Sequence, residues 1–285
     1  MKRLRHYTKG TAIVLSCFGS VVAQERYLDL QSKVQARYPE CEVRLAVSSR
    51  MVIKKLASSH QHFEHLPSVL ASLDLEGYQR ILVVSCYLFP TDEHKQVEMI
   101  TQGFKYFSLS AIDHTPAIIH HTHCATELLG ELNEHFSQGS DINLFVHHGA
   151  PYLDNAGHQA ITYCDTLLGQ LSDKNISCSL EGATPFHLLK SALQDRLLSR
   201  QQGEFAEKPK LRIIPLLLVS GNHFINDMES IKCQLEEYCE VELAQCEDGT
   251  SFNLLSLRIV SDIIFKQIDQ GLLRLRTPKE EMHGG

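Results

Sequence analysis

Apolar runs of strand length alternate along this chain with amphipathic stretches of helix length, and in each pair the strand comes first. Such an alternation is typical of parallel sheets, in which each crossover helix packs on a face of the sheet. Several runs, RILVVSCYLF and LRIIPLLLVS among them, are continuous enough to indicate strands covered on both faces. The sequence therefore predicts an α/β fold with doubly wound, mostly parallel sheets that bind ligands at the carboxyl ends of their strands.

The individual elements follow from these two periodicities. The expected strands are AIVLSCF, EVRLAVSS, RILVVSCYLF, KYFSLSAI, INLFVHH, ISCSLEG, LRIIPLLLVS and VELAQC. The expected helices are ERYLDLQSKVQARY, LPSVLASLDLEGY, DEHKQVEMITQGF, CATELLGELNEHF, HQAITYCDTLLGQL, TPFHLLKSALQDRLL and a final SFNLLSLRIVSDIIFKQI.

The two halves of the chain resemble each other. AIVLSCFGSVVAQERYLDL parallels NLFVHHGAPYLDNAGHQAI, and RILVVSCYLFPTDEHKQVE parallels LRIIPLLLVSGNHFINDME. We therefore expect two similar α/β lobes over residues 10–138 and 139–272, with a cleft between them and the metal site in the second lobe. Residues 273–285 show no periodicity, which predicts a disordered tail.

Composition narrows the classes of function. With a net charge of -7 and a pI near 6.1, the chain has no basic stripe, so nucleic acid is not an expected partner. Nine scattered cysteines favour free thiols in a reducing compartment, and hence the cytoplasm. No apolar run is long enough to cross a membrane, so a membrane partner is not expected either. The sequence leaves a homo-oligomer open.

The N-terminus has two interpretations. MKRLRHYTKG followed by TAIVLSCFGSVVA imitates a secretory signal, with a small-residue cleavage site ending at Ala23. The alternative is a first strand that turns at Gly19 into a helix starting near Gln24. We favour the strand, because Ser16, Cys17 and Gly19 interrupt the apolar core; a cleaved signal would instead make the protein periplasmic.

Three residues that can carry metal or proton chemistry follow apolar runs. His148 lies in INLFVHHGAP, Glu181 in ISCSLEGATP and His223 in LRIIPLLLVSGNHFINDM. Strand ends that converge would present two imidazoles and a carboxylate, a ligand set that Co²⁺, Ni²⁺, Fe²⁺ and Zn²⁺ accept. The three residues lie far apart in sequence, so the site would exist only in the folded chain. His147 is the neighbouring competitor, although side chains alternate along a strand and should point the two histidines to opposite faces.

At these residues the chain resembles the anaerobic cobalt chelatases that load sirohydrochlorin, within the class II chelatase and ferrochelatase-like superfamily. The similar segments are SCFGS, SSRMVIKKL, FPTDEH, FVHHGA, SLEGATP and PLLLVSGNHFINDM, and the last, read as a strand running into a GNHFIND loop, is the most specific. The resemblance implies a bilobal fold, Co²⁺ as the substrate metal with Ni²⁺ or Fe²⁺ as alternatives, sirohydrochlorin as the tetrapyrrole substrate, and no nucleotide. It also implies that His148, Glu181 and His223 hold the metal and act in catalysis.

The chain also departs from the family. Relatives carry a histidine where this chain has Tyr87, which removes a histidine proton acceptor or metal ligand from the first lobe. Arg50, Lys54 and Lys55 follow the second strand and could contact the carboxylates of the substrate, although a solvated helix face is the simpler interpretation of the two lysines.

Other histidine and cysteine clusters are better explained without a metal. With 16 histidines in the chain, chance accounts for the groups in IIHHTHCATE and HQHFEH. Cys233, Cys239 and Cys246 lack the Cys-x-x-Cys spacing of a zinc knuckle. The sequence therefore predicts a sirohydrochlorin cobaltochelatase of cobalamin biosynthesis. The alternative is a non-catalytic tetrapyrrole or metal carrier on the same fold, exported if the signal is cleaved.

Overall fold

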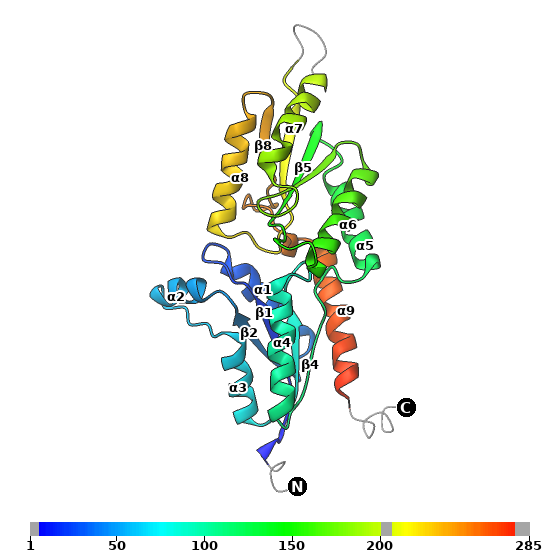
Figure 1. Ribbon diagram of the computed structural model, residues 1–285. Coiled ribbons are helices and arrows are strands. Elements are labelled where there is room, and N and C mark those ends of the chain that lie inside the picture. The colour runs from blue at the N-terminus through cyan, green and yellow to red at the C-terminus, as the bar shows by residue number, and fades with distance from the viewer. Residues whose placement is uncertain (1–5, 201–206, 277–285) are drawn as a thin grey trace. The chain divides into compact units, whose positions relative to one another are not determined.

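A computed structural model describes residues 6–200 and 207–276, except for the side chains of Arg200, Asn222 and His223. The chain clusters into two compact units. Residues up to Ile118 and those from Val260 onward form the first unit, and Ile119–Ile259 form the second. Figure 1 shows a sheet with flanking helices in each unit.

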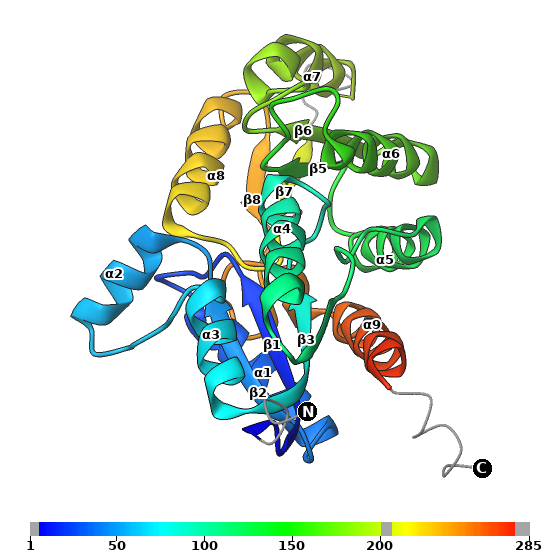
Figure 2. The ribbon, with the colours of Figure 1, turned by 60° about the horizontal axis from the view of Figure 1, so that its bottom comes forward.

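The first unit is built around a 4-stranded parallel sheet of order β2-β1-β3-β4. Its elements are β1 (Lys9–Cys17), α1 (Gln24–Arg37), β2 (Glu42–Val47), α2 (Arg50–Ser58), α3 (Leu66–Glu76), β3 (Tyr78–Ser85), α4 (Asp92–Phe107), β4 (Ala111–His114) and α9 (Arg258–Leu275). In Figure 2 the sheet strands β1 and β3 lie between α3 and α4 on one side and α9 on the other.

Successive side chains of each strand in the first sheet point to opposite faces of the sheet, as the pleat of a β-strand requires. Ile81 and Val83 of β3 pack with Leu70 and Leu73 of α3 in one apolar cluster. Leu82, between them in sequence, lies under α9 at Gly271, where a Cβ would come within 2.6 Å of its side chain. The continuous apolar runs of the sequence thus reflect strands that are covered on both faces.

The second unit repeats this plan with a 4-stranded parallel sheet of order β6-β5-β7-β8. Its elements are α5 (Thr122–His135), β5 (Ile142–His147), α6 (Ala156–Leu171), β6 (Asn175–Ser179), α7 (Phe186–Arg200), β7 (Lys210–Pro215), α8 (Asn222–Leu235), β8 (Glu240–Leu243) and a 3₁₀ turn over Leu254–Ser256. The strand orders correspond one to one, so β5 takes the place of β1, β6 of β2, β7 of β3 and β8 of β4.

The predicted α/β class with parallel, doubly wound sheets is confirmed, and so is the N-terminal strand. Two element predictions are wrong. The expected strand KYFSLSAI is divided between the end of α4 and β4, because Lys105–Phe107 complete the last turn of the helix. The GNHFIND segment, expected as a loop, forms the first turns of α8.

The two units are not divided at a single point of the chain, as the expected lobes are. The last helix, α9, runs to Leu275 and belongs to the first unit, while α5 belongs to the second. Residues 277–285 of the expected tail lie outside the described residues. The lobe limits 10–138 and 139–272 therefore stay a prediction. Within the part of the chain that the structure describes, no helix is both long and apolar enough to cross a membrane.

Candidate metal and substrate site

His148 directly follows β5, and Glu181 is the second residue after the end of the neighbouring strand β6. In the parallel register His147 is opposite Ser179, so the next residues of both strands leave the sheet side by side. The Leu180 N–H donates to the carbonyl of His147 and the Glu181 N–H donates to that of His148, both at 3.0 Å. Both His148 and Glu181 are exposed. The backbone therefore holds an imidazole and a carboxylate at adjacent positions that a substrate can reach.

Two glycines make this close approach of the loops possible. Gly149 has φ 101° and Gly182 has φ 89°, in the region that side chains disfavour. A Cβ on Gly149 would lie 1.9 Å from the carbonyl oxygen of Glu181, and one on Gly182 would lie 2.6 Å from that of Ala150. Each loop can approach the other only because the glycine in it has no side chain. Contact between the two backbones therefore fixes the spacing of His148 and Glu181.

His223 lies near the start of α8, which follows β7. Because β7 pairs with β5 through Pro215 and Val146, the carboxyl ends of β6, β5 and β7 meet at one edge of the second sheet. The side chain of His223 lies outside the described residues, and no three described His, Cys, Asp or Glu side chains are grouped so that they could hold a metal. The three-residue ligand set remains a prediction, with the topology placing its members at one sheet edge.

His147, the competitor for the metal, faces the other way. It is 2% exposed, and its Nε2 lies 3.2 Å from an Asp165 carboxylate oxygen on α6. Alternation along β5 thus directs His147 under a helix and leaves its neighbour His148 at the surface.

The first unit has the same backbone arrangement with different side chains. The Ser48 N–H donates to the carbonyl of Cys17 at 2.9 Å, and the Ser49 N–H to that of Phe18 at 3.2 Å. Gly19 follows with φ 88°. Phe18 therefore occupies the position of His148, and Ser49 that of Glu181. Neither is a metal ligand of the expected kind, so the expected ligand set occurs in the second unit and not at the matching positions of the first.

Comparison with known proteins agrees with the repeated fold and with the motifs. The sequence model of one family, described as cobalt chelatase (CbiK), matches residues 11–245, which is most of the chain. The chain belongs to the cobalt chelatase family. It is therefore a metal chelatase.

Solved structures with the same fold include two of SirB and one of CbiX. SirB from Bacillus subtilis with Fe³⁺ has a TM-score of 0.61 at 15% identity, with 93% of this chelatase and 96% of SirB covered. The sirohydrochlorin chelatase SirB from Bacillus subtilis subspecies spizizenii, in complex with cobalt, has 0.59 at 12% identity, covering 93% and 95%. CbiX, the terminal enzyme for siroheme biosynthesis in denitrifying bacteria, has 0.53 at 14% identity, covering 92% and 98%. At these identities the likeness is one of fold.

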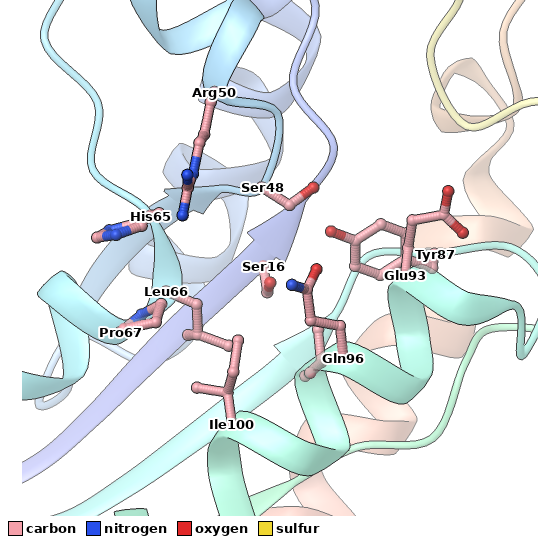
Figure 3. A pocket seen from close by; sticks show the side chains of 11 residues that line it. Ser16, Ser48, Arg50, His65, Leu66, Pro67, Tyr87, Glu93, Gln96 and Ile100 are labelled. Atoms are coloured by element: carbon pink, nitrogen blue, oxygen red, sulfur yellow. The ribbon is translucent and has the colours of Figure 1, made fainter.

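The chelatase also has a hollow at the carboxyl edge of its first sheet, which we name the first-unit hollow. It encloses about 140 Å³, and Figure 3 shows side chains from β1, the β2–α2 loop, α2, the start of α3, the β3–α4 loop and α4 around it. Its lining is formed by Ser16, Ser48, Arg50, His65, Leu66, Pro67, Tyr87, Glu93, Gln96, Val97 and Ile100. Tyr87 and Arg50 stand out in the sequence as individual residues. Ser16 and Ser48 lie in the family-like segments SCFGS and SSRMVIKKL without being distinguished there, and Gln96 belongs to no recognised motif.

Burial controls the titrating groups around this hollow. It raises the pKa of Tyr87 well above its usual value, against the smaller lowering effect of the Ser48 and Ser16 hydroxyls. Burial also raises the pKa of the Cys86 thiol to about 12. At neutral pH the phenol is therefore a hydrogen-bond donor, and in the metal-free protein the Cys86 thiol is protonated.

The other clusters of histidines and cysteines in the chelatase are dispersed. His120, His121 and His123 are exposed, and His123 lies 3.1 Å from Glu127 on the same helix. Cys233 is exposed, whereas Cys239 is buried. Among the described side chains none of these clusters forms a group that could hold a metal.

Proposed function

We propose that this chelatase inserts Co²⁺ into sirohydrochlorin, in anaerobic cobalamin biosynthesis and in the cytoplasm. Membership of the cobalt chelatase family supports the coarser statement that it is a metal chelatase acting on a tetrapyrrole. The single observation that carries the proposal is the pair of hydrogen-bonded loops that presents His148 and Glu181 side by side at an exposed sheet edge, with the helix that carries His223 starting at the same edge.

The chemistry of metalation explains this set of residues. Two pyrrole N–H groups of the free macrocycle must lose their protons as Co²⁺ forms its bonds to the four nitrogens, so two protons leave for each metal inserted. Neutral imidazoles hold a borderline divalent cation and accept protons near neutral pH. In the proposed site His148 and His223 take these roles.

Glu181 adds the negative charge that two neutral imidazoles lack. A carboxylate close to the cation favours binding of a divalent metal over its loss to water, and it is a second proton acceptor as the metal leaves for the macrocycle. Because the ligands are nitrogen and oxygen rather than thiolate, the site releases the metal more readily than a cysteine cage would. A chelatase needs such release, since the metal is a substrate.

The decisive experiment mixes the purified full chain with metal-free sirohydrochlorin and then adds Co²⁺, Ni²⁺ or Fe²⁺, following the change of the absorbance spectrum on metalation. We expect catalysed insertion, with many turnovers for each protein molecule, and the largest kcat/KM with Co²⁺. Binding of the tetrapyrrole without acceleration over the protein-free reaction would contradict the proposal and favour the non-catalytic carrier. A larger kcat/KM with Ni²⁺ or Fe²⁺ would retain the chelatase and change its metal.

A further inference from the structure

The first-unit hollow is lined mainly by groups that donate hydrogen bonds or carry positive charge. Ser16 and Tyr87 lie at the ends of β1 and β3, Ser48 lies just after β2, and Arg50 begins α2. In Figure 3 the Arg50 guanidinium and the Tyr87 hydroxyl approach the space around Ser16 from two sides, while the Ser48 hydroxyl is turned away from Arg50. Such a space favours a ligand that accepts hydrogen bonds and is negatively charged.

Tyr87 is the most informative group of this lining. The residue is only 7% exposed, and its hydroxyl forms no hydrogen bond of ordinary geometry with any residue that the structure describes. Ser48 and Ser16 lie near enough to act on its pKa, yet neither satisfies the hydroxyl geometrically. A buried polar group without a partner costs free energy, and a ligand that accepts its hydrogen bond would recover that cost.

Arg50 supplies the positive charge. It is exposed, and within the described residues it has no ion pair or hydrogen-bonded side chain. The only acidic residue of the lining, Glu93, accepts a hydrogen bond from Thr91 at 2.7 Å, and in Figure 3 its carboxylate points away from the space that Arg50 faces. The charge that a ligand meets in the hollow is therefore that of the guanidinium, which binds carboxylates in a bidentate manner.

The size of the hollow and its surroundings define the ligand further. About 140 Å³ is well below the usual ~300–1,000 Å³ of a site that encloses a whole small molecule, so only part of a larger molecule fits. Phe18 and Met51 are 48% and 51% exposed. The backbone carbonyl of Phe18 accepts the N–H of Ser49, which lies in sequence between the lining residues Ser48 and Arg50, and Met51 directly follows Arg50 in α2. Apolar groups beside a polar hollow suit a flat apolar body that bears carboxylates on its rim.

We propose that the first-unit hollow binds a carboxylate group, with Arg50 as its cationic partner and Tyr87 as its buried hydrogen-bond donor. This inference rests on the proposed function, in which the carboxylate belongs to the periphery of the tetrapyrrole substrate. The same chemistry would accept a small free carboxylate. The first unit thus uses the sheet edge that corresponds to the metal site of the second unit for substrate recognition.

The test uses the full chain and three variants, Arg50→Gln, Tyr87→Phe and, as the control, Lys33→Gln. Lys33 is an exposed cation of α1 in the same unit that does not line the hollow, so its loss changes the net charge equally. Metal-free sirohydrochlorin is titrated by absorbance, and sodium propionate is titrated separately by NMR. We expect Arg50→Gln to weaken sirohydrochlorin binding about 10- to 100-fold and Tyr87→Phe about 3- to 10-fold, with Lys33→Gln near wild type.

A thermal measurement separates a binding role of Tyr87 from a structural one. Because its hydroxyl lacks a partner in the ligand-free protein, Tyr87→Phe should leave Tm unchanged or higher while weakening the ligand. Equal weakening in Arg50→Gln and Lys33→Gln, or wild-type affinity in Arg50→Gln, would overturn the proposal while leaving metalation by the wild type, and so the proposed function, intact.

If instead the wild type neither bound nor metalated sirohydrochlorin, the proposed function would fail. The propionate titration alone would then decide whether the first-unit hollow binds a carboxylate. Propionate binding that is lost in Arg50→Gln and retained in Lys33→Gln supports the hollow as a carboxylate site. Propionate shifts that are absent, or that are the same in all variants, refute it.

Discussion

Glu181 can be tested without disturbing the fold, because its side chain is exposed and the structural contact at this position is made by its backbone. Glu181→Gln keeps the size of the side chain and removes its charge. We expect weaker Co²⁺ binding and turnover slower by roughly one to three orders of magnitude, in keeping with the contribution of a positioned acid or base.

Titrating the Glu181→Gln protein first with sirohydrochlorin and then with Co²⁺ separates the two substrates. Affinity for the metal-free macrocycle should change little, since a carboxylate does not attract its carboxylates. Unchanged cobalt affinity together with unchanged turnover would show that Glu181 only ends its strand.

His223 lies in the first turn of α8, which begins at Asn222 after the N-cap residue Gly221. We expect His223→Ala to abolish metalation and to leave circular dichroism and Tm close to wild type, because alanine favours a helix. The measurement is single-turnover metalation with protein prepared free of metal. Comparable rates for a folded mutant would remove His223 from the mechanism.

Gly149 should be far less tolerant than the residues beside it. In Gly149→Ala a Cβ would meet the Glu181 carbonyl at 1.9 Å on a backbone with φ 101°, so we expect a loss of roughly 2–4 kcal/mol in the free energy of unfolding. Gly169→Ala, in an exposed part of α6 with open space at the Cβ, is the control and should gain up to about 1 kcal/mol. Denaturant unfolding of both variants checks the contrast, and similar values for the two would contradict it.

At the scale of the elements, Glu76 ties the end of α3 to the sheet. It accepts from Lys9 of β1 at 2.8 Å and pairs with Arg44 of β2 at 2.7 Å. The hydrogen bond from Lys9 and those from Arg44 and Ser72 lower the pKa of Glu76 from 4.5 to about 2, against the effect of burial. The ionised carboxylate is thus favoured in the folded state, so these contacts stabilise the fold above about pH 4.5 and lose their effect as the pH falls to about 2.

We therefore expect Glu76→Gln to lower the free energy of unfolding by about 1 kcal/mol at pH 7, a value reduced for the partial solvent exposure of the cluster. The difference from wild type should shrink as the pH falls below about 4.5 and vanish near pH 2. Glu134→Gln, an exposed glutamate at the end of α5, is the control and should show little change. A difference that does not depend on pH would rule out the ionised carboxylate as its cause.

The periodicity of apolar residues predicted most of these helices and strands. It failed at two segments. The aromatic residues of KYFSLSAI resemble a strand, but Tyr106 and Phe107 are exposed on the last turn of α4, and only Ala111 onward pairs with β3. The GNHFIND segment was expected as a loop from its resemblance to the family motif, whereas Asn222 onward is helical. Both outcomes depend on packing that a single sequence does not display.

The candidate site could be predicted only in part from the sequence. His148, Glu181 and His223 were predicted from the motifs that follow three strands, and the parallel topology places the ends of those strands at one edge of the sheet. The sequence did not predict the first-unit hollow. Ser16 and Ser48 lie in the family-like segments SCFGS and SSRMVIKKL, but nothing in those segments shows that they surround the buried, unpartnered hydroxyl of Tyr87.

At the scale of the whole molecule, α9 completes a unit whose other elements lie at the opposite end of the sequence. Asp269 accepts from the Tyr38 hydroxyl at 2.7 Å, Gln267 donates to the Ala117 carbonyl at 3.1 Å, and Arg274 donates to Asp113 at 2.7 Å. Gly271 lets the helix lie directly on Leu82. The first unit therefore depends on the last helix to cover one face of its sheet.

Ending the chain after Leu257 should consequently destabilise the first unit selectively. The loss of α9 would expose apolar side chains worth about 1.5–3 kcal/mol each, a total comparable to the stability of a domain. Hydrogen exchange read by mass spectrometry should show fast exchange in β1 and β3 and retained protection in β5 and β7. The full-length chain, prepared in the same way, is the control, and equal protection of both sheets after truncation would contradict this account.

The left-handed glycines after β1 and β5 also bear on how such a protein can change over evolutionary time. Gly19 and Gly149 hold the same loop geometry, yet the residue before each is Phe18 in one case and His148 in the other. Where the main chain alone fixes a position, mutation can exchange the exposed side chain without a folding penalty. A lineage can therefore explore a new ligand in one copy of the loop while the other copy keeps the original activity under selection.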